Sequence, residues 1–260
     1  MADEKKTHIV KKRDLADIIH SGDPTALEIF LDDPAPVIAQ AIIDLFAHGL
    51  VALVGPGVRI VQGALKGNLF KQLAKEVKQF REKGQIDDSF GEKKYGFQSW
   101  VELLTIIDED TPDEDRLEAL KAMFYSINKV NATDADQILG YQLFQIAKRL
   151  SSNELLVLRA ARELVQAGKS KSSVLHFGDW AMGVSEHLGH NLVGLVEHAD
   201  KVLVDNLLLT GRVGSDHSSV QLSERGRLTD LGIKFCENIE RYRLEKAREH
   251  MGPRSREATR

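Results

Sequence analysis

The sequence predicts a mainly α-helical protein, with a helical array followed by a C-terminal domain that carries a small β element. Aromatic residues are only 6% and prolines are six of 260, which favours helices over a β-sandwich. Apolar residues recur at helical spacing over most of the chain. A turn-rich segment and a short strand-like run interrupt this spacing once, before a long final helix.

Composition predicts a soluble cytoplasmic protein. Charged residues are 28% and hydrophobic residues 42% of the chain, as in ordinary globular proteins. The charged start, MADEKKTHIVKKRD, has no apolar core of a signal peptide. The longest apolar window without Asp, Glu, Lys or Arg, Leu45–Val58, is 14 residues, too short to span a bilayer as a helix.

Residues 1–83 are expected to form an N-terminal helical region. Helices are predicted over Thr25–Leu31 and from Pro34 or Pro36 to about Phe46, after a basic arm. Gly55-Pro56-Gly57 then joins two helices, although the residues around it could also form a hairpin. No Lys-Ser/Thr follows these glycines, so a phosphate-binding loop is not predicted.

The helix that ends near Lys83 has two different sides. An apolar stripe runs along one side, and Lys71, Lys75 and Lys78 lie on the other. Such a helix is usually a core helix with a solvated lysine face. The alternative is a membrane-associated effector, in which residues 36–83 dock on an anionic membrane surface. The stripe consists of Val61, Leu65, Leu69, Leu73, Val77 and Phe80.

Charge is segregated along the chain. Residues 57–83 carry seven basic and two acidic side chains, whereas residues 85–118 carry three basic and eleven acidic ones. The tail from Arg241 to Arg260 carries seven basic and three acidic side chains. Such segments can form partner surfaces, or basic and acidic helices can face each other.

Residues 84–96 are predicted to be a linker, because they are rich in Gly, Lys and Asp and show no periodicity. A short apolar helix follows over Trp100–Ile107. Residues 108–115 then hold six carboxylates, which could in principle bind a metal. The spacing of a calcium loop is absent, and Thr111-Pro112 followed by acids indicates a helix N-terminus instead.

Three helices connected by short turns are predicted next, beginning after Pro112, at Ala135 and at Ser151. Thr133-Asp134 is expected to cap the second helix. The third, Ser151–Gly168, gives the clearest signal, because Ser151 and Glu154 fit a capping box and Gly168 ends the apolar periodicity. This array is expected to continue into the C-terminal domain as one unit over residues 97–248.

The last third predicts helices near Asp179–His190 and over Leu192–Leu209, the second capped by Asn191, then a strand over Ser219–Leu222 and a long final helix from residue 226. This order is typical of a winged-helix domain with a small β-wing. The run VQLS at 220–223, followed by LTDLG at 228–232, resembles the wing-to-helix junction of bacterial winged-helix proteins. That resemblance covers residues 151–248 and implies binding of DNA or a partner protein.

The whole layout also resembles the Abi-alpha family of bacterial abortive-infection proteins. The shared features are an apolar helical front, an acidic middle helix and the LT-x-x-G end. This resemblance implies a role in phage defence. Together, the two resemblances favour a regulatory or phage-defence protein, and they leave open whether the chain also forms a homo-oligomer.

The candidate DNA contacts are arginines, because affinity for DNA depends largely on neutralising phosphates. The helix before the wing, Leu192–Leu209, carries one lysine against three acidic residues and is a poor docking surface. Basic residues in the wing, after it and in the last helix could compensate. These are Arg212, Arg225, Arg227, Arg241 and Arg243.

Catalysis is not predicted, nor are a cofactor and a metal site. There is no Gly-x-Ser-x-Gly motif, and Cys236, the single cysteine, lies in an apolar helical stretch where a thiol is usually inert. His187 and His190 could share a helical face, but no third metal ligand has a telling spacing. We therefore expect a non-enzymatic protein that binds DNA or a protein partner.

Overall fold

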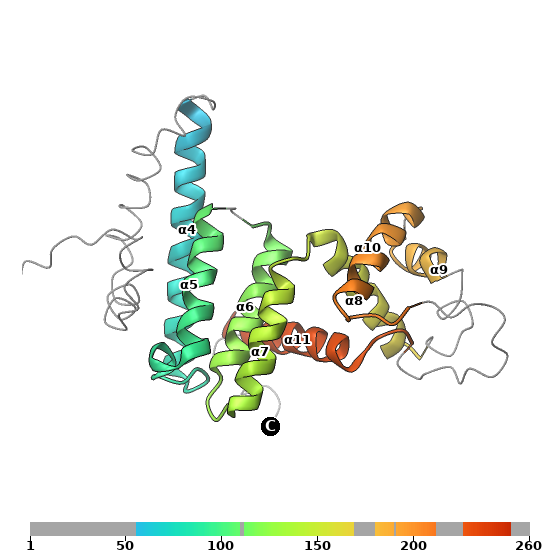
Figure 1. Ribbon diagram of the computed structural model, residues 1–260. Helices are drawn as coiled ribbons and strands as arrows, with labels where there is room; N and C mark the ends of the chain where they lie inside the picture. The colour runs from blue at the N-terminus through green and yellow to red at the C-terminus, as the bar shows by residue number, and fades with distance from the viewer. Residues whose placement is uncertain (1–55, 110–111, 169–179, 190, 212–225, 251–260) are drawn as a thin grey trace, which may run out of the picture. The chain divides into compact units, whose positions relative to one another are not determined.

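The computed structural model describes residues 56–109, 112–168, 180–189, 191–211 and 226–250, which form eight α-helices and contain no β-strand (Figure 1). The prediction of a mainly helical protein is confirmed. The chain divides into two compact units, Met1–Thr111 and Pro112–Arg260. The helices predicted before residue 55 and the strand predicted over 219–222 lie outside the described residues.

The first unit is built on helix α4, Pro56–Glu82, which begins at the predicted Gly-Pro-Gly junction. Proline suits the first position of a helix because its missing N–H would have no partner there. From residue 66 on, one side of α4 is buried and includes Leu73, Val77 and Phe80 of the predicted stripe, while Leu69 is half-buried. Helix α5, Lys94–Glu109, returns along α4 (Figure 1). Lys66 of α4 contacts Asp108 near the end of α5. From residue 66 on, the buried side chains of α4 are Phe70, Leu73, Ala74, Val77 and Phe80.

Residues 84–96, predicted to be a linker, are part of the core of this unit. Ile86 and Phe90 are buried, and Phe90 lies in the short 3-10 helix η2, Phe90–Glu92. The rings of Phe90 and Trp100 form a T-shaped pair with their centres 6.3 Å apart. Asp87 accepts hydrogen bonds from Lys93 (2.6 Å) and from Ser89, and these bonds lower its pKa to about 2. In place of the predicted linker, the chain forms a packed turn. The turn is held by the Asp87–Lys93 ion pair and by the buried side chains of Ile86 and Phe90.

The second unit begins with an antiparallel pair of helices. Helix α6, Glu114–Asn128, has Asp113 as its N-cap, two residues later than the predicted cap at Thr111. Asp113 accepts the backbone N–H of Arg116 at 2.9 Å and also contacts Ser152. Burial raises the pKa of Asp113, but these two hydrogen bonds outweigh that effect and bring it below its usual value. The acidic segment thus includes a helix cap, as predicted.

Helix α7, Asp134–Ala147, starts at the predicted cap, where Thr133 and Asp136 form a capping box. It packs closely on α6, since a Cβ placed on Gly140 would lie 2.8 Å from the side chain of Ile127. Helix α8, Ser152–Gln166, starts at the predicted capping box of Ser151 and Glu154, where the Ser151 N–H donates to Glu154 at 2.6 Å. Both sequence-based cap predictions are confirmed.

Helices α9, Trp180–His187, and α10, Val193–Asp205, pack on α8 and on each other. Trp180, Val184, Val196 and Leu203 are buried in the core that they share. The N-cap of α10 is Leu192 rather than the predicted Asn191, and its backbone N–H donates to the buried hydroxyl of Ser185 at 2.7 Å. A buried side chain of α9 thus helps to fix the start of α10, which has no side-chain cap.

The chain after α10 is joined to the start of the last helix by one antiparallel bridge, between Leu209 and Leu228. The N–H of Thr210 donates to the carbonyl of Arg227 at 2.7 Å. Helix α11, Asp230–His250, then packs against α6 and α8. The predicted β-wing is not supported, because the described residues contain this bridge and no strand. Residues 212–225 lie outside them.

Candidate functional site

Arg227, predicted to contact DNA, is buried inside the second unit. It is 4% exposed, and its Nη2 lies 2.8 Å from Oδ1 of Asp200 on α10. The same guanidinium donates to the carbonyl of Thr210 from Nε (3.0 Å) and Nη2 (2.6 Å). It also lies 4.5 Å from the ring centre of Trp180 on α9. Arg227 therefore ties α9 and α10 to the Leu209–Leu228 bridge and is not available to a phosphate.

The LTDLG sequence forms the junction between α10 and α11. Thr229 donates its hydroxyl to the carbonyl of Leu207 (2.6 Å) and accepts the N–H of Gly232 (2.9 Å), so it caps α11. A Cβ on Gly232 would lie 2.1 Å from the carbonyl oxygen of Leu208. The glycine is needed because the first turn of α11 lies directly on the backbone that leaves α10. This contact explains why the LTDLG sequence has glycine at position 232.

The solvent side of α10 has little positive charge. Its exposed side chains include Glu197, Asp205 and a single lysine, Lys201, together with Leu195 and His198. Val196, Ala199 and Leu203 point inward. A DNA-reading helix needs cations near the phosphates, whereas this side is slightly acidic and partly apolar.

Arg243 also has a structural partner. Its Nε and Nη2 donate to the two carboxylate oxygens of Glu118 on α6, at 2.9 and 2.7 Å. This paired contact raises the pKa of Arg243 above its usual value, with burial acting in the opposite direction. Of the other predicted DNA contacts, Arg241 lines a small polar hollow on α11, and Arg212 and Arg225 lie outside the described residues.

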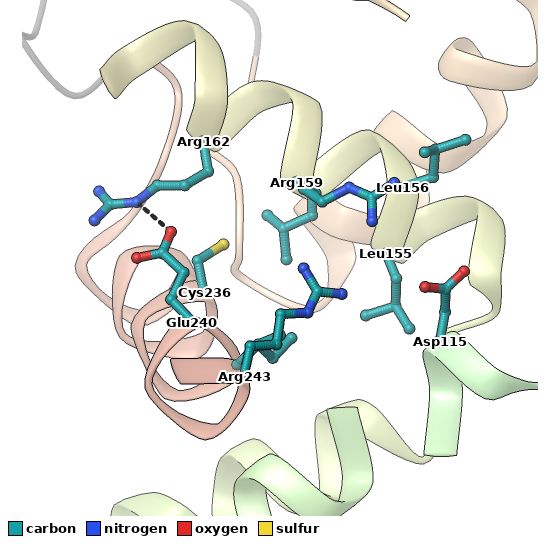
Figure 2. A pocket seen from close by; sticks show the side chains of 10 residues that line it. Asp115, Leu155, Leu156, Arg159, Arg162, Cys236, Glu240 and Arg243 are labelled. Atoms are coloured by element: carbon teal, nitrogen blue, oxygen red, sulfur yellow. Dashed lines mark hydrogen bonds and ion pairs between the residues drawn. The ribbon is translucent and has the colours of Figure 1, made fainter. Parts of the chain in front are cut away.

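A pocket of about 50 Å³ lies between α8 and α11 and could hold a few water molecules (Figure 2). Its walls are mainly apolar and include Leu155, Leu158 and Ile239. Arg162 pairs with Glu240 at 3.4 Å on one side, and Figure 2 shows Asp115 on the opposite side. The pocket therefore resembles a small gap between two packed helices, bordered by an ion pair.

Cys236 also lines this pocket, but its chemistry is that of a core residue. Burial raises the pKa of its thiol to about 12, so the thiol stays protonated at neutral pH. His187 lies 2.9 Å from a carboxylate oxygen of Glu163, which links α9 to α8. Among the described residues no group of three His, Cys, Asp or Glu side chains could hold a metal ion, and His176 and His190 lie outside them.

The lysines of α4 form the other predicted surface. Lys71, Lys75 and Lys78 are exposed, on the side away from the buried stripe. The basic and acidic segments meet at the edges of this surface, where Lys66 pairs with Asp108 and Arg81 with Asp88. No helix in the described part of the chain is both long and apolar enough to cross a membrane.

The chain was compared with protein-family models, curated proteins and solved structures, and none of them matches it.

Proposed function

We propose that the chain is a non-enzymatic regulatory protein whose C-terminal unit acts as a winged-helix-type module that binds a partner protein. The order of α8, α9, α10, the Leu209–Leu228 bridge and α11 supports the module. The bridge pairs Leu209 with Leu228, the two positions between which a wing would lie.

The solvent side of α10 is the observation that favours a protein partner over DNA. Glu197 and Asp205 outnumber Lys201 there, and Leu195 adds an exposed apolar side chain. Met182 on α9 is a second exposed apolar residue. Mixed apolar and charged surfaces of this kind suit protein contacts better than phosphate contacts.

Arg227 and Arg243 weigh against DNA for a separate reason. Both were expected to supply positive charge, but Arg227 is buried against Asp200, and Arg243, although partly exposed, is paired with Glu118. DNA binding would then depend on Arg212, Arg225 and Arg241. The membrane alternative has less support, because the apolar side of α4 from Phe70 to Phe80 is already buried. Phage defence is the biological setting that the Abi-alpha resemblance implies for this proposal.

A photo-crosslinking amino acid at Glu197 or Lys201 tests the proposed surface. Both side chains are exposed on α10, so we expect a crosslinked protein partner at these positions in extracts of the native cells. The same label at Leu244, an exposed residue of α11, is the matched control and is expected to give no such product.

The partner would then be identified, purified and titrated against the wild-type chain and the Leu195→Glu variant. We expect the variant to bind at least about tenfold more weakly, because it places a charge in the apolar part of the contact. Equal crosslinking at Leu244, or equal affinity of the two chains, would contradict the proposal. A crosslink between two copies of this chain would identify the partner as the protein itself.

A further inference from the structure

A second hollow in the C-terminal unit lies between α6, α7 and α11 and has a volume of about 20 Å³, room for one oxygen atom of a ligand. Lys234, Asn238 and Arg241 line it from α11. These positions are spaced by four and three residues and so share one side of the helix. Ser126 and Lys129 line it from the end of α6.

The lining of this hollow is positively charged. Lys129, Lys234 and Arg241 face one acidic residue, Asp136. That carboxylate is already engaged in the cap of α7, where Oδ2 accepts the N–H of Thr133 at 3.0 Å and its hydroxyl at 2.7 Å. Those bonds, together with the nearby Lys129 and Lys234, hold the pKa of Asp136 below its usual value. Asp136 therefore stays ionised without neutralising all three cations.

Arg241 is, like Lys129, a cation of this hollow that no carboxylate pairs with among the described residues. It has no hydrogen bond or ion pair with any residue that the structure describes, and Lys234 has only a 4.0 Å contact with Glu237. By contrast, Arg227, Arg162 and Arg243 of the same unit are all paired with carboxylates. An arginine that is partly buried beside two lysines, without an acid of its own, favours an anion from outside the chain.

Asn238 provides an independent observation. Its side chain lines the hollow but is only 2% exposed, and its Nδ2 has only a weak contact with the sulfur of Met123 at 3.7 Å. Its Oδ1 is buried and accepts no hydrogen bond within the described part of the chain. Buried polar atoms normally have partners, so this oxygen indicates a missing donor such as a ligand hydroxyl.

We propose that this hollow binds a phosphate group, either free hydrogen phosphate or the end of a small phosphomonoester. One phosphate oxygen enters the hollow, and the remaining oxygens meet Lys129, Lys234 and Arg241 at its mouth. A P–OH can donate to Oδ1 of Asn238, whereas sulfate has no hydrogen to donate at neutral pH. The site is formed by α6, α7 and α11, so it does not depend on the function proposed for α10.

Titration calorimetry of the full chain with inorganic phosphate at pH 7, in a phosphate-free buffer of low ionic strength, tests this site. We expect saturable binding that weakens at least about tenfold in Arg241→Gln. The matched control is Arg248→Gln on the same helix, because Arg248 is 71% exposed and, among the described residues, is paired only with Glu245. It is expected to keep the wild-type affinity, and circular dichroism checks that both variants keep their helices.

Two further titrations identify the anion. Sulfate is expected to bind more weakly than phosphate. Competition by a 5′-mononucleotide would extend the site to phosphomonoesters, and its absence would assign the site to free phosphate. Either result keeps the site. The proposal is overturned if phosphate shows no saturable binding up to about 10 mM, if sulfate binds as tightly as phosphate, or if the two arginine variants lose binding equally.

Discussion

Replacing Gly232 by alanine is expected to destabilise the C-terminal unit by about 3 kcal/mol. The new Cβ would lie 2.1 Å from the carbonyl oxygen of Leu208, which is backbone and cannot turn aside as a side chain could. Relief of this clash would move the first turn of α11 away from the end of α10. That movement would also weaken the Thr229 cap and the Leu209–Leu228 bridge.

Urea denaturation followed by circular dichroism measures this effect, with Gly194→Ala as the matched control. Gly194 is exposed on α10, and a Cβ there would meet nothing within 4 Å. Alanine is the better helix former, so we expect Gly194→Ala to leave stability unchanged or to raise it by about 0.5 kcal/mol. A loss of less than about 0.5 kcal/mol in Gly232→Ala would contradict the packing of α11 described above.

Replacing Arg227 by alanine is expected to cost about 3–5 kcal/mol. The substitution leaves the carboxylate of Asp200 buried without its cation, and it removes the group that covers the ring of Trp180. The carbonyl of Thr210 also loses its donors. Because one side chain connects α9, α10 and the bridge, its loss should weaken all three contacts together.

A double-mutant cycle with Asp200→Asn separates the ion pair from the other contacts of Arg227. We expect the double variant to lose less stability than the sum of the two single variants, because the asparagine leaves no unpaired charge. Arg248→Ala is the control, with an expected change within about 0.5 kcal/mol, since its contact with Glu245 is on the surface. Strict additivity in the cycle would show that the Arg227–Asp200 contact is not energetically coupled.

Helix starts were the most predictable feature of the sequence. The caps at Thr133 and Ser151 follow from short-range patterns, in which a hydroxyl and an acid three residues later satisfy each other's backbone groups. The apolar stripe of α4 is also local, because it depends only on helical periodicity. Such features need no knowledge of which segments meet in the folded chain.

The segment 84–96 shows where local patterns fail. Its glycines, lysines and aspartates are also the residues of linkers, and only Ile86 and Phe90 hint at burial. The N-cap of α10 was predicted one residue too early, at Asn191, for a similar reason. The sequence near Leu192 gives no sign that its N–H bonds to Ser185 of α9. These contacts arise when separate elements pack together.

Contacts between separate elements also limited the prediction of functional arginines. From sequence, Arg227 and Arg243 were surface cations, because neither Asp200 nor Glu118 is near them in the chain. One signal was present: Asp200 lies four residues after Val196 and three before Leu203, on the buried side of α10. An acid on an apolar helical side indicates a buried cation elsewhere. The basic hollow at Arg241 also depends on α6 and α7 and could not be read from α11 alone.

Our central proposal is that α10 presents a protein-binding side, and that two of the five arginines expected to bind DNA, Arg227 and Arg243, stabilise the fold instead. Its most direct test is a fluorescence anisotropy titration of a 30-base-pair duplex with the full chain at 50 mM salt. The account predicts no binding up to about 10 µM protein, since the solvent side of α10 lacks the charge that phosphate contacts need. An affinity tighter than about 1 µM that falls steeply between 50 and 200 mM salt, and is lost in the triple variant Arg212→Ala, Arg225→Ala, Arg241→Ala, would contradict it.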